Sequence, residues 1–219
     1  MTRIVSSRST RPAKAPSKRP TRPRKKAIQA RSIDTVDAIL RATTRILVRE
    51  GYDALSTNRV ATAAGVSIGS LYQYFPNKES LVAALLDRHL DQMLGLIATE
   101  TPTLLGLPVD AAVRRFVELM IDAHRIDPEL HRVFVEQIPR FGDLARIESV
   151  QERGVALARA YLGAHAAELR IADPDLAAFL LVTTVEAVTH GAVISKPELL
   201  RSTALVDETT DLLVRYLRA

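Results

Sequence analysis

The stretch that decides the fold is LSTNRVATAAGVSIGSLYQYFPNKESL, residues 55–81. It contains three helix starts in close succession, because Ser56, Ser67 and Asn77 can each accept a hydrogen bond from the free N–H groups of a first helical turn. Gly65 can adopt the left-handed conformation that ends a helix. The stretch therefore predicts three helices joined by tight turns, which is a helix-turn-helix arrangement.

The middle helix, residues 68–75, is only about two turns long and needs support from its neighbours. Leu71 and Phe75 are spaced i, i+4 and should face those neighbours. The outward face would then carry Gly69, Ser70, Tyr72, Gln73 and Tyr74. Glycine in a helix interior costs about 1 kcal/mol relative to alanine, which favours a position where another molecule comes very close. We interpret this face as a surface for a DNA major groove.

Residues 49–81, REGYDALSTNRVATAAGVSIGSLYQYFPNKESL, resemble the tetracycline-repressor-like (TetR/AcrR) family of bacterial transcription regulators. The resemblance implies an N-terminal DNA-binding domain of three helices and a larger helical domain that dimerises and binds a small molecule, which relieves repression. It places Ile68, Gly69 and Tyr72 near base edges. It places on the DNA backbone the residues Thr57, Asn58, Arg59, Ser70, Gln73, Tyr74 and Lys78. The alternative for Tyr72 and Tyr74 is that either one packs against the first helix.

Phosphate contacts also follow from position, because Thr57, Asn58 and Arg59 would occupy the first turn of a helix, where free N–H groups and the helix dipole favour an anion. Lys78 could act in the same way from the next helix. The 68–75 helix has no Arg or Lys to bind guanine in a bidentate manner. Sequence selection would then depend on apolar contacts, Gln73, DNA shape or the N-terminal arm.

The net charge of +5 is unevenly distributed along the 219 residues. Residues 1–31 contain eleven Lys or Arg, four prolines and no acidic residue, whereas the rest of the chain has 19 basic against 25 acidic residues. We expect residues 1–31 to be a disordered arm. It is either a solvated tail or a segment that lies along DNA phosphates or in a minor groove.

Several function classes are disfavoured by composition and by missing motifs. The chain has no cysteine, and its longest uninterrupted apolar run, residues 176–182, is far shorter than a membrane span. We therefore expect a cytoplasmic protein. No nucleophile-elbow, dinucleotide-binding, P-loop or zinc-protease spacing occurs, so we expect no enzyme and no cofactor. The five histidines never pair at i, i+4, so we also expect no metal site.

The remaining pattern predicts an all-α protein of about nine helices. The expected domains are the arm (1–31), a helix-turn-helix domain (32–78) and a helical ligand-binding and dimerisation domain (79–219). The first helix should run from Ser32 to Glu50, and a long linking helix from Lys78 to near Thr101-Pro102. Proline and capping signals predict further helices from Pro108, Asp127 to Pro139, Asp143 to Ala167, Asp173 to Ser195 and Pro197 to Arg218.

The segment 176–193 is apolar nearly all round, which requires cover on two sides. Its own domain is one cover and a second copy of the chain is the natural other, which predicts a four-helix interface with the last helix. The expected interface residues are Leu180, Leu181, Val185, Val188, Leu205 and Leu212.

Polar residues on this segment suggest a ligand site. Thr183, Glu186 and His190 follow one another at helical spacing, and buried polar groups need partners. They could instead form a satisfied network at the subunit interface or a solvent-facing strip at its edge. The other candidate ligand-binding residues are His89, Met93, Phe116, Met120, His124, Phe134 and Gln137, although Met and Phe at helical spacing can simply be core.

Two functions remain open from the sequence. The first is a homodimeric repressor that leaves a palindromic operator when a small apolar ligand binds. The second is an architectural or constitutive DNA-binding protein without a ligand. A palindromic footprint that a small molecule removes would favour the first, and sequence-indifferent coating of DNA would favour the second.

Overall fold

The computed structural model describes residues 30–141 and 144–218, and within these ranges every regular element is helical. The N-terminal end consists of α1 (Ala30–Glu50), α2 (Thr57–Ala64) and α3 (Ile68–Tyr74). The rest is α4 (Lys78–Leu105), α5 (Val109–His124), α6 (Pro128–Phe141), α7 (Leu144–Ala164), η1 (Ala166–Glu168), α8 (Pro174–Ser195), η2 (Pro197–Arg201) and α9 (Thr203–Arg218). The all-α prediction is confirmed. The predicted disordered arm lies almost wholly outside the described residues.

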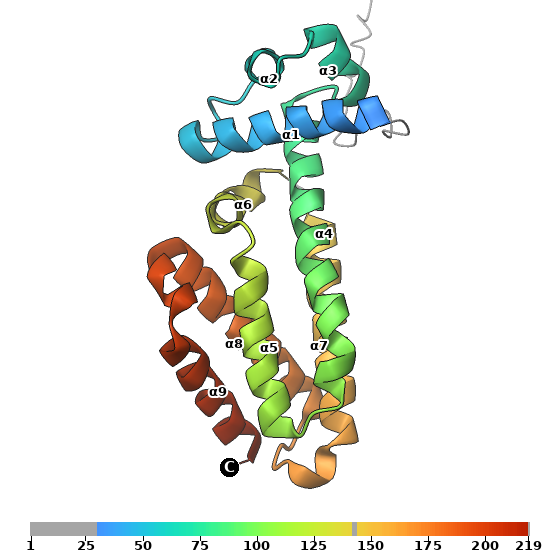
Figure 1. Ribbon diagram of the computed structural model, residues 1–219. Helices are drawn as coiled ribbons and strands as arrows, with labels where there is room; N and C mark the ends of the chain where they lie inside the picture. Colours follow the sequence, from blue (N-terminus) through green and yellow to red (C-terminus); the bar gives the residue numbers. More distant parts are fainter. Residues whose placement is uncertain (1–29, 142–143, 219) are drawn as a thin grey trace, which may run out of the picture.

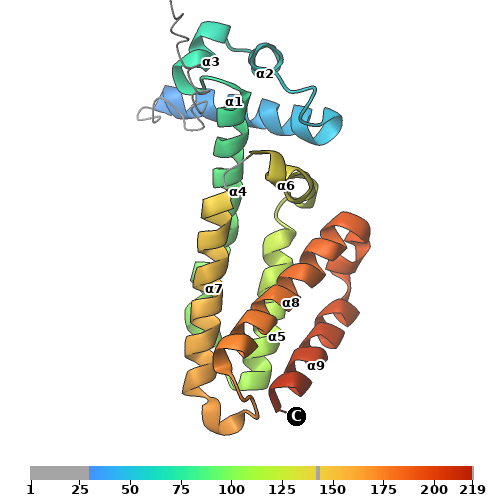
Figure 2. The same cartoon turned by 180° about the vertical axis from the view of Figure 1, so that it is seen from behind.

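Helix α4 is the structural link of the molecule. It begins against α1–α3 and runs alongside α5 and α7 toward the opposite end (Figures 1 and 2). Asn77 caps it by accepting a hydrogen bond from the Ser80 N–H at 2.8 Å. The Ser80 hydroxyl in turn accepts a hydrogen bond from the Asn77 N–H at 3.4 Å, which completes a capping box. A movement of α4 would therefore reach both ends of the molecule.

Two hydrophobic cores lie at the two ends. The first joins α1, α2 and α3 to the first half of α4 and to Leu130, Val133 and Phe134 of α6. The second joins α5, α7, α8, η2 and α9. The domain boundary at residue 78 remains a prediction, and the first core continues beyond it through Leu81 to Leu86 of α4.

Several predicted helix boundaries differ from the structure, two of them at a proline. The linking helix does not stop at Pro102 but continues to Leu105, because a proline that close to the end of a helix disrupts only its last turn. Likewise α6 continues past Pro139 to Phe141. The predicted last helix is divided, with η2 beginning at Pro197 and α9 at Thr203. The expected start at Asp143 lies outside the described residues.

Helix α8 is covered by neighbours on several sides. Among the described helices it is the one long and apolar enough to span a membrane by length and composition alone. It nevertheless packs against α5, α6, α7 and α9, and Val185 at its centre is fully buried. A core helix passes the same composition test, and these contacts give α8 that role.

Candidate nucleic-acid interface and ligand cavity

The caps predicted for α2 and α3 are confirmed. Ser56 accepts a hydrogen bond from the Arg59 N–H at 3.3 Å, and Ser67 accepts one from the Ser70 N–H at 3.0 Å. Gly65 ends α2 with φ of 68°, in the left-handed region. The sequence therefore fixes the turn between the two helices through local hydrogen bonds and one glycine.

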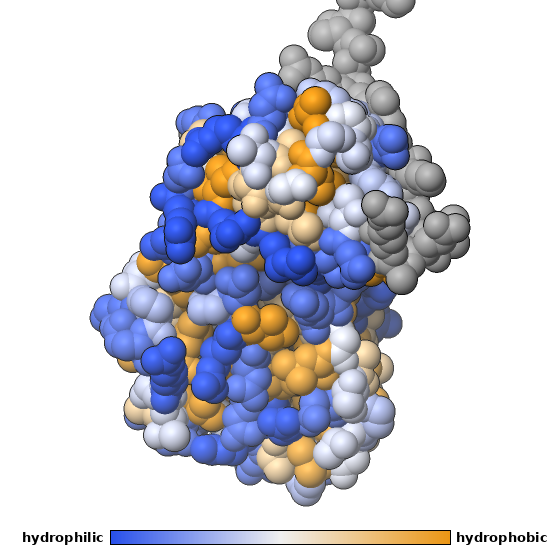
Figure 3. Space-filling view, turned by 45° about the horizontal axis from the view of Figure 1, so that its top comes forward, coloured by the Kyte–Doolittle hydropathy of each residue, from blue (hydrophilic) through white to orange (hydrophobic). Residues whose placement is uncertain are grey.

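Helix α3 presents an exposed face at the end of the molecule. Ile68 and Tyr72 expose 38% and 42% of their surfaces, and Gly69 and Gln73 are exposed beside them. At this end of the molecule a hydrophobic area is surrounded by hydrophilic residues (Figure 3). The opposite side of α3 is fixed by Leu71 and Phe75, which are fully buried as predicted.

Gly69 is not required by the protein's own packing. It lies in regular helix, and a Cβ added there would meet nothing closer than the Ser67 Oγ at 3.9 Å. An alanine would therefore fit and would favour the helix by about 1 kcal/mol. Because glycine has no side chain, another molecule can approach the backbone closely at this point of the exposed face.

Tyr72 is connected to the first turn of α2. Its phenol oxygen lies 3.1 Å from the Thr57 hydroxyl, across the turn between the helices. This hydrogen bond gives an exposed aromatic ring a defined position. Two residues expected at different parts of the DNA, a base edge and the backbone, thus act as one unit in the structure.

The two basic residues of the predicted interface already have partners within the protein. One Arg59 nitrogen donates to the Ala54 carbonyl at 2.8 Å, and the other pairs with Glu50 at 2.6 Å. The Lys78 ammonium lies 4.1 Å from the centre of the Tyr52 ring. The Arg59–Glu50 pair is nearly half exposed on both sides, so its strength is at most about 1 kcal/mol and a phosphate could displace it.

The outward orientation expected for Tyr74 is wrong. Its side chain is 7% exposed and belongs to the first core, which is the packed alternative considered for the two tyrosines. Tyr74 ends α3, where the helix turns back toward α1 and α4, so its ring fills the core. Such a side chain offers little area to DNA. Asn58 is exposed, whereas Thr57 and Ser70 are partly buried.

An apolar cavity of about 220 Å³ lies between α4, α5, α7 and α8. Its walls are mainly aliphatic and aromatic, and its polar residues are Thr101, Arg153, Tyr161 and Glu186. The α4 wall includes Leu94 and Ile97, from the half of the helix farther from α1–α3. A cavity of this character suits a small, largely apolar molecule.

Three of the ten predicted ligand-binding residues line this cavity: Phe116, Met120 and Glu186. The other seven do not, and they are His89, Met93, His124, Phe134, Gln137, Thr183 and His190. Sequence reasoning missed the α7 wall, where Gly154 and Ala158 leave room beside Leu157. The spacing of small residues on that helix was the available signal.

The polar groups of the cavity are held by other parts of the protein. Glu186 accepts a hydrogen bond from the Gln151 side chain at 3.1 Å, and burial raises the pKa of its carboxyl group. The Tyr161 hydroxyl donates to the Leu107 carbonyl at 2.7 Å. Of the three predicted residues Thr183, Glu186 and His190, only Glu186 therefore combines a cavity position with a defined polar partner in the described chain.

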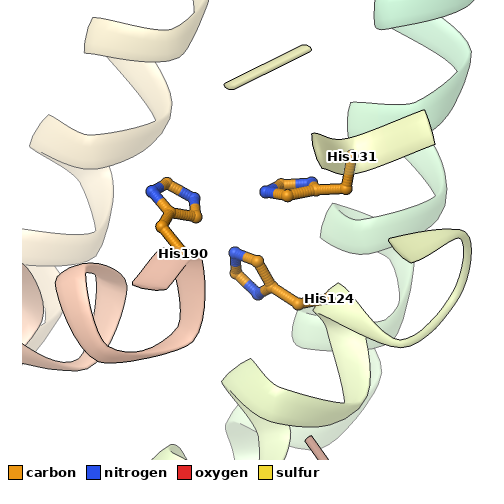
Figure 4. A group of neighbouring side chains, drawn as sticks. All are labelled: His124, His131 and His190. Atoms are coloured by element: carbon orange, nitrogen blue, oxygen red, sulfur yellow. The ribbon is translucent and has the colours of Figure 1, made fainter. Parts of the chain in front are cut away.

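Four histidines converge in a separate place. His124 (α5), His131 (α6) and His190 (α8) point toward one another, with one nitrogen of each lying within 4.8 Å of the others (Figure 4). His89 of α4 joins them, because its Nε2 lies 2.9 Å from the His131 Nδ1. The sequence predicts no metal site because no two histidines are spaced i, i+4 on one helix. That argument does not cover histidines that come together from four different helices.

The predicted dimer residues divide into two groups. Leu180 and Leu212 are 37% and 58% exposed, and Val188 and Leu205 are partly buried. Leu181 and Val185 are buried within their own chain, so the expectation that they face a partner is wrong. They occupy the side of α8 that packs on α5 and α7. Additional exposed apolar residues on α8 and α9 are Leu176, Phe179, Ile194 and Tyr216.

Family models match both parts of the chain. The model for bacterial regulatory proteins of the tetR family matches residues 39–85, and the model for the tetracyclin repressor-like C-terminal domain matches residues 108–217. Together they cover the helix-turn-helix and the α5, α7 and α8 walls of the cavity, whereas the α4 wall lies between the two matches.

Curated relatives are transcription regulators by name. The repressor KstR of Mycolicibacterium smegmatis is 40% identical over 55 residues, which are 25% of this chain and 27% of KstR. An uncharacterised helix-turn-helix regulator of Mycobacterium tuberculosis is 28% identical over 187 residues, or 84% of this chain and 95% of the relative. The chain thus spans about a quarter of the length of the first curated relatives it matches, and nearly all of others.

Solved structures share the whole fold. A TetR-family regulator from Mesorhizobium loti superposes with a TM-score of 0.65 at 22% identity, covering 87% of this chain and all of that one. The complex of SmeT with triclosan superposes with a TM-score of 0.60 at 24% identity, covering 84% and 92%.

Proposed function

Because this chain belongs to the tetracycline-repressor-like family of transcription regulators, we propose that it is a homodimeric, cytoplasmic repressor that a small apolar ligand releases from DNA. The observation that carries this proposal is the position of α4. One end of the helix supports the exposed face of α3, and the other end forms a wall of the apolar cavity. No enzymatic activity is part of the proposal.

The proposed DNA contacts fall into two groups. Ile68, Gly69 and Tyr72 form the face that approaches the bases, supported by their exposure and by the open space at Gly69. Gln73 is exposed beside them and would contact the DNA backbone. Thr57, Asn58, Arg59, Ser70 and Lys78 would hold the phosphates, since they lie at or beside helix N-termini. Tyr74 is not included, because it is buried.

A dimer would place two such faces on one duplex. The exposed apolar residues of α8 follow a helical stripe through Leu176, Leu180 and Ile194, and Leu212 and Tyr216 of α9 add to it. Adjacent apolar faces of this kind favour a four-helix contact between two copies. The two α3 helices would then enter successive major grooves, about 34–36 Å apart.

The ligand would act by preferring one arrangement of the two ends. Residues 32–78 would serve as the DNA-binding domain and 79–219 as the ligand-binding and dimerisation domain, with α4 passing between them. A molecule that fills the cavity contacts α4, α5, α7 and α8 together and can favour one position of α4. Release from DNA requires that it bind that state more tightly than the DNA-bound state. The SmeT–triclosan complex supports an apolar aromatic ligand in this fold.

The test is a footprint on DNA from the protein's own genome, followed by titration with apolar compounds such as triclosan. The proposal expects protection of a palindromic sequence, one dimer per site, and loss of protection as the compound binds. A ligand-independent footprint that extends over any sequence would instead support an architectural DNA-binding protein. Protection that strengthens with the compound would contradict release.

A further inference from the structure

The histidine cluster of His89, His124, His131 and His190 is separate from the apolar cavity and has no role in the function proposed above. It brings together the end of α5, the first turn of α6 and the inner sides of α4 and α8. Ring centres lie 4.4 Å apart for His124 and His131, and 5.1 Å apart for each of these with His190. Packing imidazoles together in a core needs a reason, because aliphatic side chains would fill the same space without burying polar atoms.

Several nitrogens of the cluster have no hydrogen-bond partner in the described part of the protein. His124 and His131 are 2% and 7% exposed, yet the Nε2 atom of each is buried and unpaired. The Nδ1 atom of His89 is buried and unpaired as well. A buried polar atom without a partner costs about 1–3 kcal/mol, and several in one cluster are unusual.

Hydrogen bonds determine which nitrogens can act as ligands. The His124 Nδ1 lies 2.6 Å from the Met120 carbonyl, which can only accept, so this nitrogen carries the proton and Nε2 offers a lone pair. If His131 Nδ1 donates to His89 Nε2, the His131 Nε2 offers a lone pair in the same way. A metal-binding histidine usually donates a hydrogen bond to a neighbour from the N–H of its second ring nitrogen.

Burial and one nearby carboxylate set the electrostatics of the cluster. Burial lowers the pKa of His124, His131 and His190, because it disfavours the charged ring. The Asp127 carboxylate acts electrostatically on His89 and would offset part of a cation's charge.

We propose that His124, His131 and His190 bind a divalent late first-row transition-metal ion such as Zn²⁺, with a fourth coordination position left for water. Three imidazoles select such ions, whereas Mg²⁺ and Ca²⁺ require oxygen ligands. Tetrahedral coordination with bonds of about 2.0–2.1 Å places the nitrogens about 3.4 Å apart. The nitrogens lie within 4.8 Å of one another, so each pair must approach by at most about 1.4 Å to close the site, and the partly buried His190 side chain can move to do so.

His89 is a positioning residue in this site. It does not reach the ion but holds the His131 ring through the Nε2 to Nδ1 hydrogen bond. It also belongs to α4, so the site connects the linking helix to α5, α6 and α8. Metal binding at this site requires neither DNA nor a second subunit. It can therefore be tested separately from the proposed repressor function.

The experiment uses full-length protein without a histidine tag, freed of metal by a chelator. Zn²⁺ is titrated against a chromophoric chelator, and Co²⁺ is titrated while visible absorption is recorded. We expect one ion per chain and the intense Co²⁺ absorption of a four- or five-coordinate site, with no binding of Mg²⁺ at the same concentration. Absence of saturable binding by Zn²⁺, Co²⁺, Ni²⁺ and Cu²⁺ would overturn the proposal.

Substitutions locate the site. His124→Asn and His190→Asn should each weaken Zn²⁺ binding at least about 100-fold, and His89→Gln about 10-fold, as loss of a positioning hydrogen bond does. The matched control is His165→Asn, because His165 lies outside the cluster and bonds to the Tyr161 carbonyl, just as His124 bonds to that of Met120. An effect of His165→Asn equal to that of His190→Asn would contradict the assignment.

A crystal of the unsubstituted protein grown with Zn²⁺ gives a test that needs no variant. Anomalous scattering at the zinc edge should show a maximum between His124, His131 and His190. A maximum elsewhere, or ordered water alone among the four rings, would overturn the proposal even if a variant failed to fold.

Discussion

The hydroxyl groups of Thr57 and Tyr72 lie 3.1 Å apart, so the first turn of α2 holds the most exposed aromatic ring of α3 in place. The two residues are fifteen positions apart in the sequence and meet because Gly65 reverses the chain between their helices. The contact would orient Tyr72 before the proposed DNA contact forms, which would lower the entropy lost on binding.

Tyr72→Ala is expected to weaken operator binding by about 1–3 kcal/mol, roughly 10-fold to 100-fold, and non-specific binding much less. Tyr72→Phe keeps the ring and removes only the hydrogen bond to Thr57, so its loss should be smaller. Fluorescence anisotropy with operator and scrambled duplexes measures both. Equal losses on the two duplexes would make Tyr72 a positioning residue and not a base-reading one.

Gly69→Ala is expected to separate stability from DNA binding. The new methyl group has room within the protein, so the free energy of unfolding should rise by about 0.5–1 kcal/mol. Operator affinity should nevertheless fall, because the methyl group fills the place where the DNA approaches. Gly95→Ala is the matched control, since Gly95 is also helical and open but lies far along α4. It should raise stability alone, and unchanged operator binding by Gly69→Ala would reject the close approach.

Local signals allowed the N-terminal part to be predicted closely. Ser56, Ser67 and Asn77 cap the helices where expected, because a cap and its hydrogen bonds lie within four residues of sequence. Tyr74 was placed wrongly for a different reason. A residue at the end of a short helix can face either side. Tyr74 is buried because α1 and α4 pack against that side of α3, which the local sequence does not show.

Features formed by several helices could not be predicted in the same way. The small residues of α7 can be seen in the sequence, but whether they face a cavity depends on how distant helices pack, and the meeting of His124, His131 and His190 depends on the same packing. Periodicity identified α8 as covered on several sides. It could not tell which apolar residues face the chain's own core, so Leu181 and Val185 were assigned to the wrong side.

Leu212→Glu is expected to convert the proposed dimer to a monomer. Leu212 is 58% exposed on α9, which packs against α8, so its charged replacement is tolerated in the free subunit but not in an apolar contact. Analytical ultracentrifugation reports the change. Ile33→Glu, at a comparably exposed site on α1, should leave the oligomeric state unchanged. A Leu212→Glu protein that remains dimeric would place the interface elsewhere.

Ala158→Phe is expected to fill the cavity and abolish binding of apolar ligands. Ala158 lines the cavity on α7, whereas Ala156 is exposed nearby, so Ala156→Phe is the control. Binding of a fluorescent apolar probe such as anilinonaphthalene sulfonate, and its displacement by triclosan, would be measured for each protein. Operator binding by Ala158→Phe should persist and no longer respond to ligand. Probe binding equal to that of the unchanged protein would exclude this cavity as the ligand site.

Removal of residues 1–29 is expected to reduce the salt dependence of DNA binding. The truncated chain begins where α1 begins, so the described fold stays intact while ten of the eleven basic residues of the 1–31 segment are lost. Each phosphate contact contributes about −0.9 to the slope of log affinity against log salt, so loss of several contacts flattens the slope by several units. A full-length variant with those ten residues replaced by glutamine separates charge from length. Identical slopes for all three proteins would show that the arm does not contact DNA.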